Sequence, residues 1–244
     1  MLLIAVAMVS FSACSSSSGE LVINDDSEIS AGIDESAGEN EGYYSNKVYY
    51  VGEDLPAGGY VISCTGTDFY MSAVVFENER SYEEFQDAKK TTVGDVNEAV
   101  EIHAWADFYL EQDEKAYIGL RKGNVILLND GKCEFSKYNP DESQTVYSGI
   151  YVVGEDIEAD KLNIKCISDY LQVTVFDSRD SYLAYHRSGR FTIGEESDAI
   201  EEFADSTDVV YEEESTYVNL SDKMIMMVEE GTGKYSIDKG PIIN

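Results

Sequence analysis

Residues 50–64 read YVGEDLPAGGYVISC, and residues 152–166 repeat the pattern as VVGEDIEADKLNIKC. Each copy has an apolar start, an acidic turn, a tight bend and an alternating strand. Pro56 presets φ for a turn, and Gly58 tolerates a positive φ just before the strand. Asp160 stands at the position of Gly58 in the second copy, and aspartate is one of the few other residues that visit the left-handed region. The stretch predicts the start of a β module that occurs twice.

The remainder of the two halves follows a common register. Residues 92–95, TVGD, match residues 192–195, TIGE, at an offset of 100, and the register holds from residue 76 onward. A register of this length is typical of an internal duplication. We therefore predict two tandem β-rich repeat domains, at residues 47–138 and 146–239, which superpose as two copies of one fold.

The composition favours strands. The chain has 18 tyrosines and one tryptophan, and tyrosine is enriched on pleated, half-buried surfaces. Residues 60–64 and 162–166 alternate as a half-buried strand does. Three closing strands are predicted in the first repeat, at 116–120, 125–128 and 132–136, with turns at 122–124 and 129–131. The predicted fold class is mostly β, with β-sandwich or jelly-roll-like modules and one short helix in each.

The short helix is predicted from the middle of each repeat. Residues 81–84, SYEE, have the form of a capping box, which predicts a helix from Ser81 to about Lys89. Residues 181–188 are the counterpart. Residues 99–110 fit either a helix or a strand, and their first half favours a helix.

The opening stretch also resembles a known module. Residues 51–60, VGEDLPAGGY, look like the "VGxDIPAGxY" opening of a small module in surface lipoproteins of Gram-positive bacteria. Residues 117–120, YIGL, and 217–220, YVNL, are similar to that module's closing strands. The resemblance implies a mostly β, extracytoplasmic module, and it carries no catalytic residues to transfer.

The N-terminus reads as a secretion signal. Residues 1–13 are uncharged and mostly apolar, and the run is too short to span a bilayer. Ser12 and Ala13 precede Cys14 as in a bacterial lipobox, which predicts Cys14 as the lipid attachment site. The alternative is a buried apolar strand with an ordinary cysteine. Residues 14–46 are rich in Ser, Gly, Glu and Asp, so we expect an acidic, disordered linker between the lipid anchor and the first repeat.

The charge excludes some partners. With 48 acidic and 17 basic residues, the formal net charge is −31. Nucleic acid and anionic membrane surfaces would repel such a chain. We therefore expect contact with the membrane only through the lipid anchor at Cys14, and no nucleic-acid partner.

The cysteines allow two interpretations. Cys64 and Cys166 are equivalent in the repeat, while Cys133 has no cysteine counterpart. A Cys64–Cys133 bridge would connect two strands of the first repeat. Alternatively, the cysteines are small buried hydrophobic residues, which the lack of a partner for Cys166 favours.

Polar side chains with catalytic or metal-binding potential do not form a recognisable motif. His103 and His186 do not align between the repeats, and no HExxH, GxSxG or CxxC pattern is present. The acidic residues 195–198 and 212–214 could contribute oxygens to Ca²⁺, although no loop has EF-hand spacing. We therefore expect no catalytic residue, no metal site and no cofactor.

Aromatic side chains are the remaining candidates for ligand binding. Rings that could stack on sugars or peptides, or that pack between strands, are Tyr43, Tyr44, Tyr49, Tyr50, Trp105, Phe108 and Tyr109.

Three functions follow as hypotheses. The first is a lipid-anchored protein on the outer side of the bacterial cell membrane that acts as a non-enzymatic binding or structural module, with an envelope glycan or protein as its ligand. The second is a carboxylate-based hydrolase of cell wall or glycan. The third is an accessory solute-binding lipoprotein, which the absence of a βαβ pattern disfavours.

Overall fold

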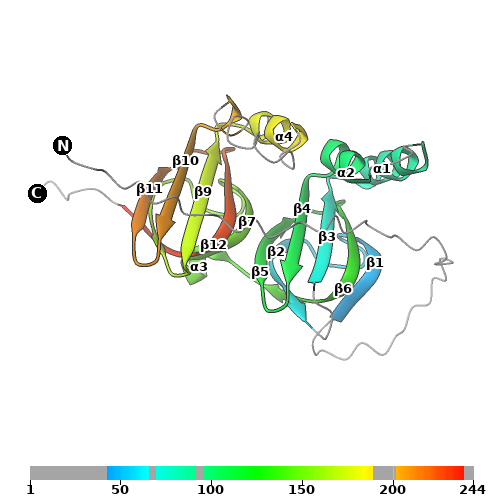
Figure 1. Cartoon of the computed structure of the whole chain (residues 1–244), viewed down its shortest axis with the longest axis horizontal. Helices are drawn as coiled ribbons and strands as arrows, with labels where there is room; N and C mark the ends of the chain where they lie inside the picture. Colours follow the sequence, from blue (N-terminus) through cyan, green and yellow to red (C-terminus); the bar gives the residue numbers. More distant parts are fainter. Residues whose placement is uncertain (1–42, 66–69, 92–95, 189–199, 201, 239–244) are drawn as a thin grey trace, which may run out of the picture. The chain divides into compact units, whose positions relative to one another are not determined.

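The computed structural model describes residues 43–65, 70–91, 96–188, 200 and 202–238. The folded unit lies within Glu35–Asn244. The strands of its first half are β1 (Tyr43–Tyr50), β2 (Gly58–Thr65), β3 (Tyr70–Phe76), β4 (Ala106–Glu111), β5 (Lys115–Leu120) and β6 (Val125–Lys137). Those of its second half are β7 (Thr145–Val152), β8 (Lys161–Cys166), β9 (Tyr170–Phe176), β10 (Ser206–Tyr211), β11 (Ser215–Asn219) and β12 (Ile225–Ile237). The fold is mostly β, as predicted (Figure 1).

The strands of the two halves pair in the same way. In the first half β6 pairs with β1, β2 and β3, and in the second half β12 pairs with β7, β8 and β9. The registers also correspond, because Tyr60 faces Ile118 across β2 and β5 while Leu162 faces Val218 across β8 and β11. Every one of these ladders is antiparallel.

The opening turn explains why glycine and aspartate recur in it. Gly52 has φ +102° and Gly154 has φ +88°, values that favour glycine. Four residues after the start of each turn, a carboxylate folds back onto the backbone. Asp54 accepts the N–H of Tyr50 at 2.9 Å, and Asp156 accepts that of Val152 at 2.8 Å. The acidic turn is therefore a hydrogen-bonded unit in both halves.

The bend after the turn differs between the copies. Gly58 has φ +149°, but no positive φ occurs at Asp160. Instead, the carboxylate of Asp160 accepts the N–H of Lys161 at 2.7 Å. The left-handed conformation that aspartate allows at this position is therefore not used by Asp160.

One predicted turn is also wrong. Residues 129–131 lie within the continuous strand β6, whereas the turn at residues 122–124 is present, with Gly123 at φ +93°. The register of β1 against β6 shifts between Ser45 and Lys47, so the strand contains an irregularity where the turn was expected. A Cβ atom on Gly131 would lie 2.5 Å from the carbonyl oxygen of Tyr70. Glycine occurs here because two backbones approach closely, and such bulges resemble turns in sequence.

The helices are α1 (Glu79–Thr91), α2 (Val96–His103), α3 (Pro140–Ser143) and α4 (Arg179–Arg187). The predicted helices at residues 81–89 and 181–188 are present as α1 and α4, but Ser81 is not the N-cap. The N–H of Ser81 donates to Oδ1 of Asn78 at 3.0 Å, and the N–H of Ser181 donates to Ser178 Oγ at 3.2 Å. Residues 99–110 form the end of α2 and then β4, so their first half is helical as the sequence favoured.

A short parallel ladder joins the two halves. β5 pairs with β7 through Ala116–Ser148, Tyr117–Gly149 and Ile118–Ile150, and this ladder links all twelve described strands into one sheet. Next to it, the rings of Tyr117 and Tyr151 stack with centroids 4.3 Å apart. The largest core cluster likewise combines first-half residues with Phe176, Tyr182 and Met227. The halves therefore share a sheet and a core, which the prediction of two tandem domains did not include.

Candidate functional site

A groove of about 1130 Å³ lies where the two halves meet. The first half contributes β4, the β4–β5 turn and the start of β5, and the second half contributes parts of β7, β9, β12 and α4.

Carboxylates dominate the charged lining. Seven acidic residues line the groove against one lysine, Lys115; they are Asp107, Glu111, Asp113, Glu114, Asp169, Glu229 and Glu230. Within the described part of the chain, Glu111, Asp113 and Asp169 form no ion pair. The groove therefore has an uncompensated negative charge.

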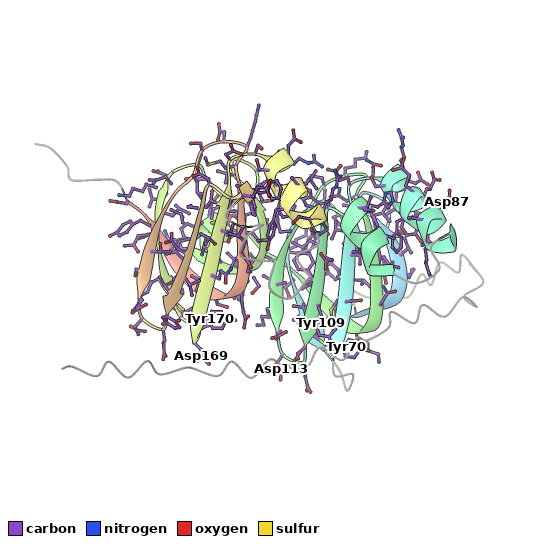
Figure 2. The ribbon with its side chains drawn as sticks, turned by 45° about the horizontal axis from the view of Figure 1, so that its top comes forward. Tyr70, Asp87, Tyr109, Asp113, Asp169 and Tyr170 are labelled. Carbon is purple, nitrogen blue, oxygen red and sulfur yellow. The ribbon has the colours of Figure 1, made fainter. Side chains whose placement is uncertain are left out.

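Tyrosines stand on both sides of this acidic surface. Tyr109 of β4 is 60% exposed and stacks on Tyr70 of β3, with ring centroids 5.0 Å apart. Tyr170 of β9 donates its hydroxyl to Glu230, and burial together with this carboxylate raises the pKa of Tyr170. Figure 2 shows Tyr109 and Tyr170 on the same side of the molecule as Asp113 and Asp169, at the strand ends away from α1, α2 and α4.

Helix α4 fixes one end of the groove. His186 is 1% exposed, and its Nε2 lies 3.0 Å from Oδ1 of Asp107, which lines the groove. The hydroxyl of Tyr182 donates to the backbone oxygen of Trp105 at 2.9 Å. Both contacts join α4 of the second half to the start of β4. His186 therefore holds the wall of the groove in place, a role that its position in the sequence did not indicate.

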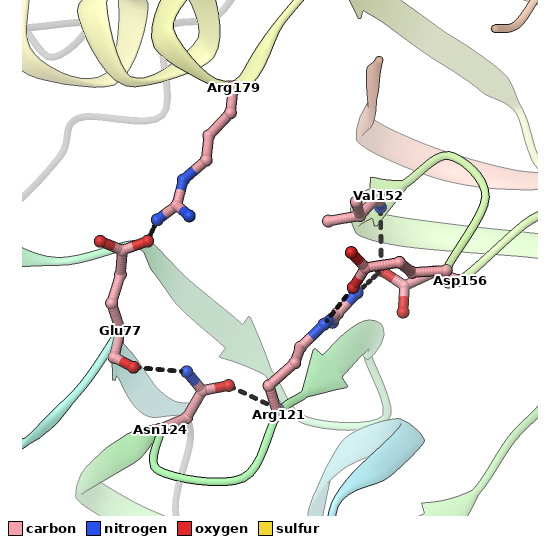
Figure 3. Close-up of polar contacts among 7 residues, drawn as sticks. Glu77, Arg121, Asn124, Val152, Asp156 and Arg179 are labelled. Atoms are coloured by element: carbon pink, nitrogen blue, oxygen red, sulfur yellow. Dashed lines mark hydrogen bonds and ion pairs between the residues drawn. The ribbon is translucent and has the colours of Figure 1, made fainter. Parts of the chain in front are cut away.

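A chain of polar contacts also crosses between the halves (Figure 3). Arg121 donates to Asp156 at 2.7 Å and to Glu155 at 3.1 Å, and its backbone N–H donates to Asn124 at 2.6 Å. Asn124 donates in turn to the backbone oxygen of Glu77 at 2.9 Å.

The far end of this chain is an ion pair between Glu77 and Arg179 of α4. Burial lowers the pKa of Arg121, but Asp156 and Glu155 more than offset this and leave it raised. The arginine therefore stays charged between the two halves, in a network whose residues are separate from the lining of the groove.

Only part of the predicted aromatic set lines the groove. Phe108 and Tyr109 line the groove, whereas Tyr49 is buried in the core. The guanidinium carbon of Arg179 lies over the ring of Trp105, 4.7 Å from the ring centroid. Tyr50 is half-buried in β1, the strand to which Tyr43 and Tyr44 also belong. Sequence reasoning missed Tyr70 and Tyr170, although they are equivalent at the offset of 100 and could have been found on that ground.

Of the two acidic stretches considered for calcium, the structure describes only residues 212–214, which do not line the groove. Residues 195–198 fall outside the described residues. In the β10–β11 turn, Glu213 pairs with Lys165, and Glu214 accepts the backbone N–H of Tyr211 at 3.1 Å. Among the described residues, no three His, Cys, Asp or Glu side chains are grouped closely enough to hold a metal ion.

The two cysteines of the first half face each other. Cys64 and Cys133 are buried thiols at directly opposite positions of β2 and β6. The N–H of Cys64 donates to Glu114, on the side away from β6, so the two form a non-hydrogen-bonded pair. Such pairs have Cα atoms about 4.5 Å apart, within the range that a disulfide accepts. Cys166 faces Gly233 and has no cysteine opposite it.

We therefore expect oxidised glutathione to join Cys64 to Cys133 and to leave Cys166 as a thiol. Non-reducing peptide mapping should recover one linked peptide pair, and alkylation after denaturation should label Cys166 but neither of the others. The variant Cys133→Ala is the control, because it should leave Cys64 open to alkylation. Alkylation of all three cysteines in oxidised wild type would contradict the expectation.

Cys14, residues 1–13 and residues 15–42 of the linker lie outside the described residues. The predicted end of the linker is wrong, because residues 43–46 form the start of β1 and pair with β6. Within the part of the chain that the structure describes, no helix is long and apolar enough to cross a membrane.

Comparison with known proteins identifies no relative. No family model matches the chain, and neither a curated protein nor a solved structure matches it significantly.

Proposed function

We propose that this protein is a lipid-anchored, extracytoplasmic binding module of the bacterial envelope and that the groove is its binding site. The observation that carries the proposal is the groove of about 1130 Å³, where tyrosines and carboxylates from distant strands line one surface. Three of these carboxylates, Glu111, Asp113 and Asp169, form no ion pair within the described part of the chain. Ligand sites combine aromatic side chains with a few charged or polar groups, and the groove offers side chains of both kinds.

The proposed location rests on the N-terminal sequence. Residues 1–13 read as a signal, Cys14 follows small residues, and the acidic linker would hold the folded unit away from the membrane. The groove would then face the envelope and its glycans and proteins.

Anchoring is tested by Cys14→Ala. Because a thioether at Cys14 would be the only attachment to the bilayer, this variant should leave the membrane fraction or remain unprocessed. The measurement is membrane fractionation with the mass of the mature chain, and Cys166→Ala serves as the control cysteine variant. Equal membrane fractions and equal masses for wild type and Cys14→Ala would reject the anchor.

Ligand binding is tested by removing one ring. We expect Tyr109→Ala to weaken binding to isolated envelope fragments about tenfold, because tyrosine is enriched among the few interface residues that contribute most of the binding energy. Tyr211→Ala is the matched control, since Tyr211 is 63% exposed and lies outside the groove. Sedimentation of each variant with the envelope fragments measures the bound fraction. Identical retention of wild type and the two variants would remove the groove from the proposal.

The second candidate is a hydrolase, favoured by the carboxylates in the groove. A glycosidase needs one acid and one nucleophile or base on either side of the scissile bond. Turnover of peptidoglycan, glycan or ester substrates that is lost in Glu111→Gln or Asp169→Asn, with folding intact, would replace the binding function by this one.

A further inference from the structure

The groove carries a negative charge that its own residues do not balance. Of its carboxylates, Glu111, Asp113 and Asp169 have no basic partner among the described residues, and Lys115 is the one basic side chain in the lining. Clefts lined by one sign of charge concentrate the field and attract ions of the opposite sign. A ligand for this surface is therefore cationic.

The charges are spread along the groove. Glu111 and Asp113 lie at the end of β4 and in the turn after it, whereas Asp169 precedes β9 and Glu230 lies in β12. Several separate cationic groups match this distribution better than one compact ion does.

The tyrosines fit the same ligand. The faces of aromatic rings attract ammonium and guanidinium groups, and Tyr109 is exposed beside the carboxylates of β4. An alkyl stem such as that of lysine or arginine can also pack on a ring while its charge reaches a carboxylate.

An edge strand forms one wall. β4 is the last strand in the sheet order and pairs with β3 alone among the described strands. Its residues Asp107–Glu111 line the groove. An extended peptide can add to such an edge, and its side chains then alternate between the two faces. Five extended residues span about 17 Å.

From these features we propose that the groove binds an extended segment of a partner protein in which lysine or arginine occupies alternate positions. This inference rests on the proposed binding function, and it specifies the class of ligand. The peptide would lie along β4, with its cationic side chains directed at Glu111, Asp113 and Asp169 and its alkyl stems against Tyr109.

The test uses a fluorescein-labelled peptide of alternating lysine and threonine, (Lys-Thr)4, with the purified full-length chain at low ionic strength. Fluorescence anisotropy measures its Kd. Because the chain has a net charge of −31, any polycation is attracted weakly, so the decisive quantity is the difference between two variants with the same charge.

The first variant combines Glu111→Gln, Asp113→Asn and Asp169→Asn. Asparagine is chosen at Asp113 because its φ of +69° is left-handed, which asparagine tolerates. The control variant combines Glu53→Gln, Glu83→Gln and Asp87→Asn, three exposed carboxylates outside the groove; Figure 2 labels Asp87 on the helical side. We expect the groove variant to weaken binding about tenfold and the control variant less than twofold.

Two further probes separate the peptide from other cations. (Lys-Thr)4 with N-methylated backbone amides should bind at least several-fold more weakly, because it cannot pair with β4. Spermine and a chitosan oligomer should compete poorly. Tyr109→Ala provides an independent variant, and it should weaken (Lys-Thr)4 binding even if the triple variant does not fold.

Equal affinities in the groove and control variants would overturn the proposal. So would equally strong competition by spermine or the chitosan oligomer, which would identify a polyamine or an amino glycan as the ligand class instead. If Tyr109→Ala weakens envelope binding while (Lys-Thr)4 binds independently of the groove, the proposed function holds and this inference fails. If neither ligand depends on the groove, both fail.

Discussion

Gly149→Ala should destabilise the fold by about 3–5 kcal/mol. A Cβ atom at this position would lie 2.3 Å from the carbonyl oxygen of Tyr117, and the residue has φ +149°. Alanine would therefore both strain the backbone and push β7 away from β5. The free energy of unfolding in urea measures the loss.

The matched control is Gly123→Ala. Gly123 also has a positive φ, +93°, but no atom lies within 4 Å of the added Cβ. Its cost should be about 1–2 kcal/mol, which is the backbone strain alone. The excess at Gly149 then reports the close approach of β5 and β7, and equal costs at the two glycines would show that this ladder does not hold the halves together.

Asp156→Ala should destabilise the fold by about 3 kcal/mol. The side chain of Asp156 is 7% exposed, accepts the N–H of Val152 and pairs with Arg121. Alanine would leave a partly buried backbone N–H without its acceptor and a guanidinium without its main partner.

The chain supplies its own control in Asp54→Ala. Asp54 makes the same contact to the backbone, with Tyr50, but it is exposed and forms no ion pair among the described residues. We expect a cost of about 1 kcal/mol, again from urea unfolding. A loss at Asp54 as large as that at Asp156 would show that the turn, and not the contact between the halves, accounts for the stability of this pair.

Local features of the fold were predictable from sequence. The glycine and aspartate of the opening turn indicated its geometry, and the alternation of residues 60–64 and 162–166 predicted β2 and β8. The errors were also local. Residues 129–131 suggested a turn because Asn, Asp and Gly favour turns, yet the same composition suits an irregularity within a strand when a backbone lies close to Gly131.

The groove could not be predicted in this way. Its lining comes from β4, β7, β9, β12 and α4, and the contact of Asp107 with His186 joins residues 79 positions apart. No spacing in the sequence relates such residues. The one available signal was the recurrence of Tyr70 as Tyr170, since two equivalent tyrosines stand beside the groove without a packing pattern to explain them.

The sequence by itself determined the strand periodicity, the turn chemistry and the recurrence of one pattern in both halves, because these depend on φ preferences and on side chains a few residues apart. Only the tertiary structure decided what each copy does. Tyr117 is buried against Tyr151 whereas its equivalent Tyr217 is 53% exposed, and Asp156 meets an arginine that Asp54 lacks. Similar local sequences thus acquire different neighbours when β5 pairs with β7. The same pairing brings distant charges and rings together to form the groove.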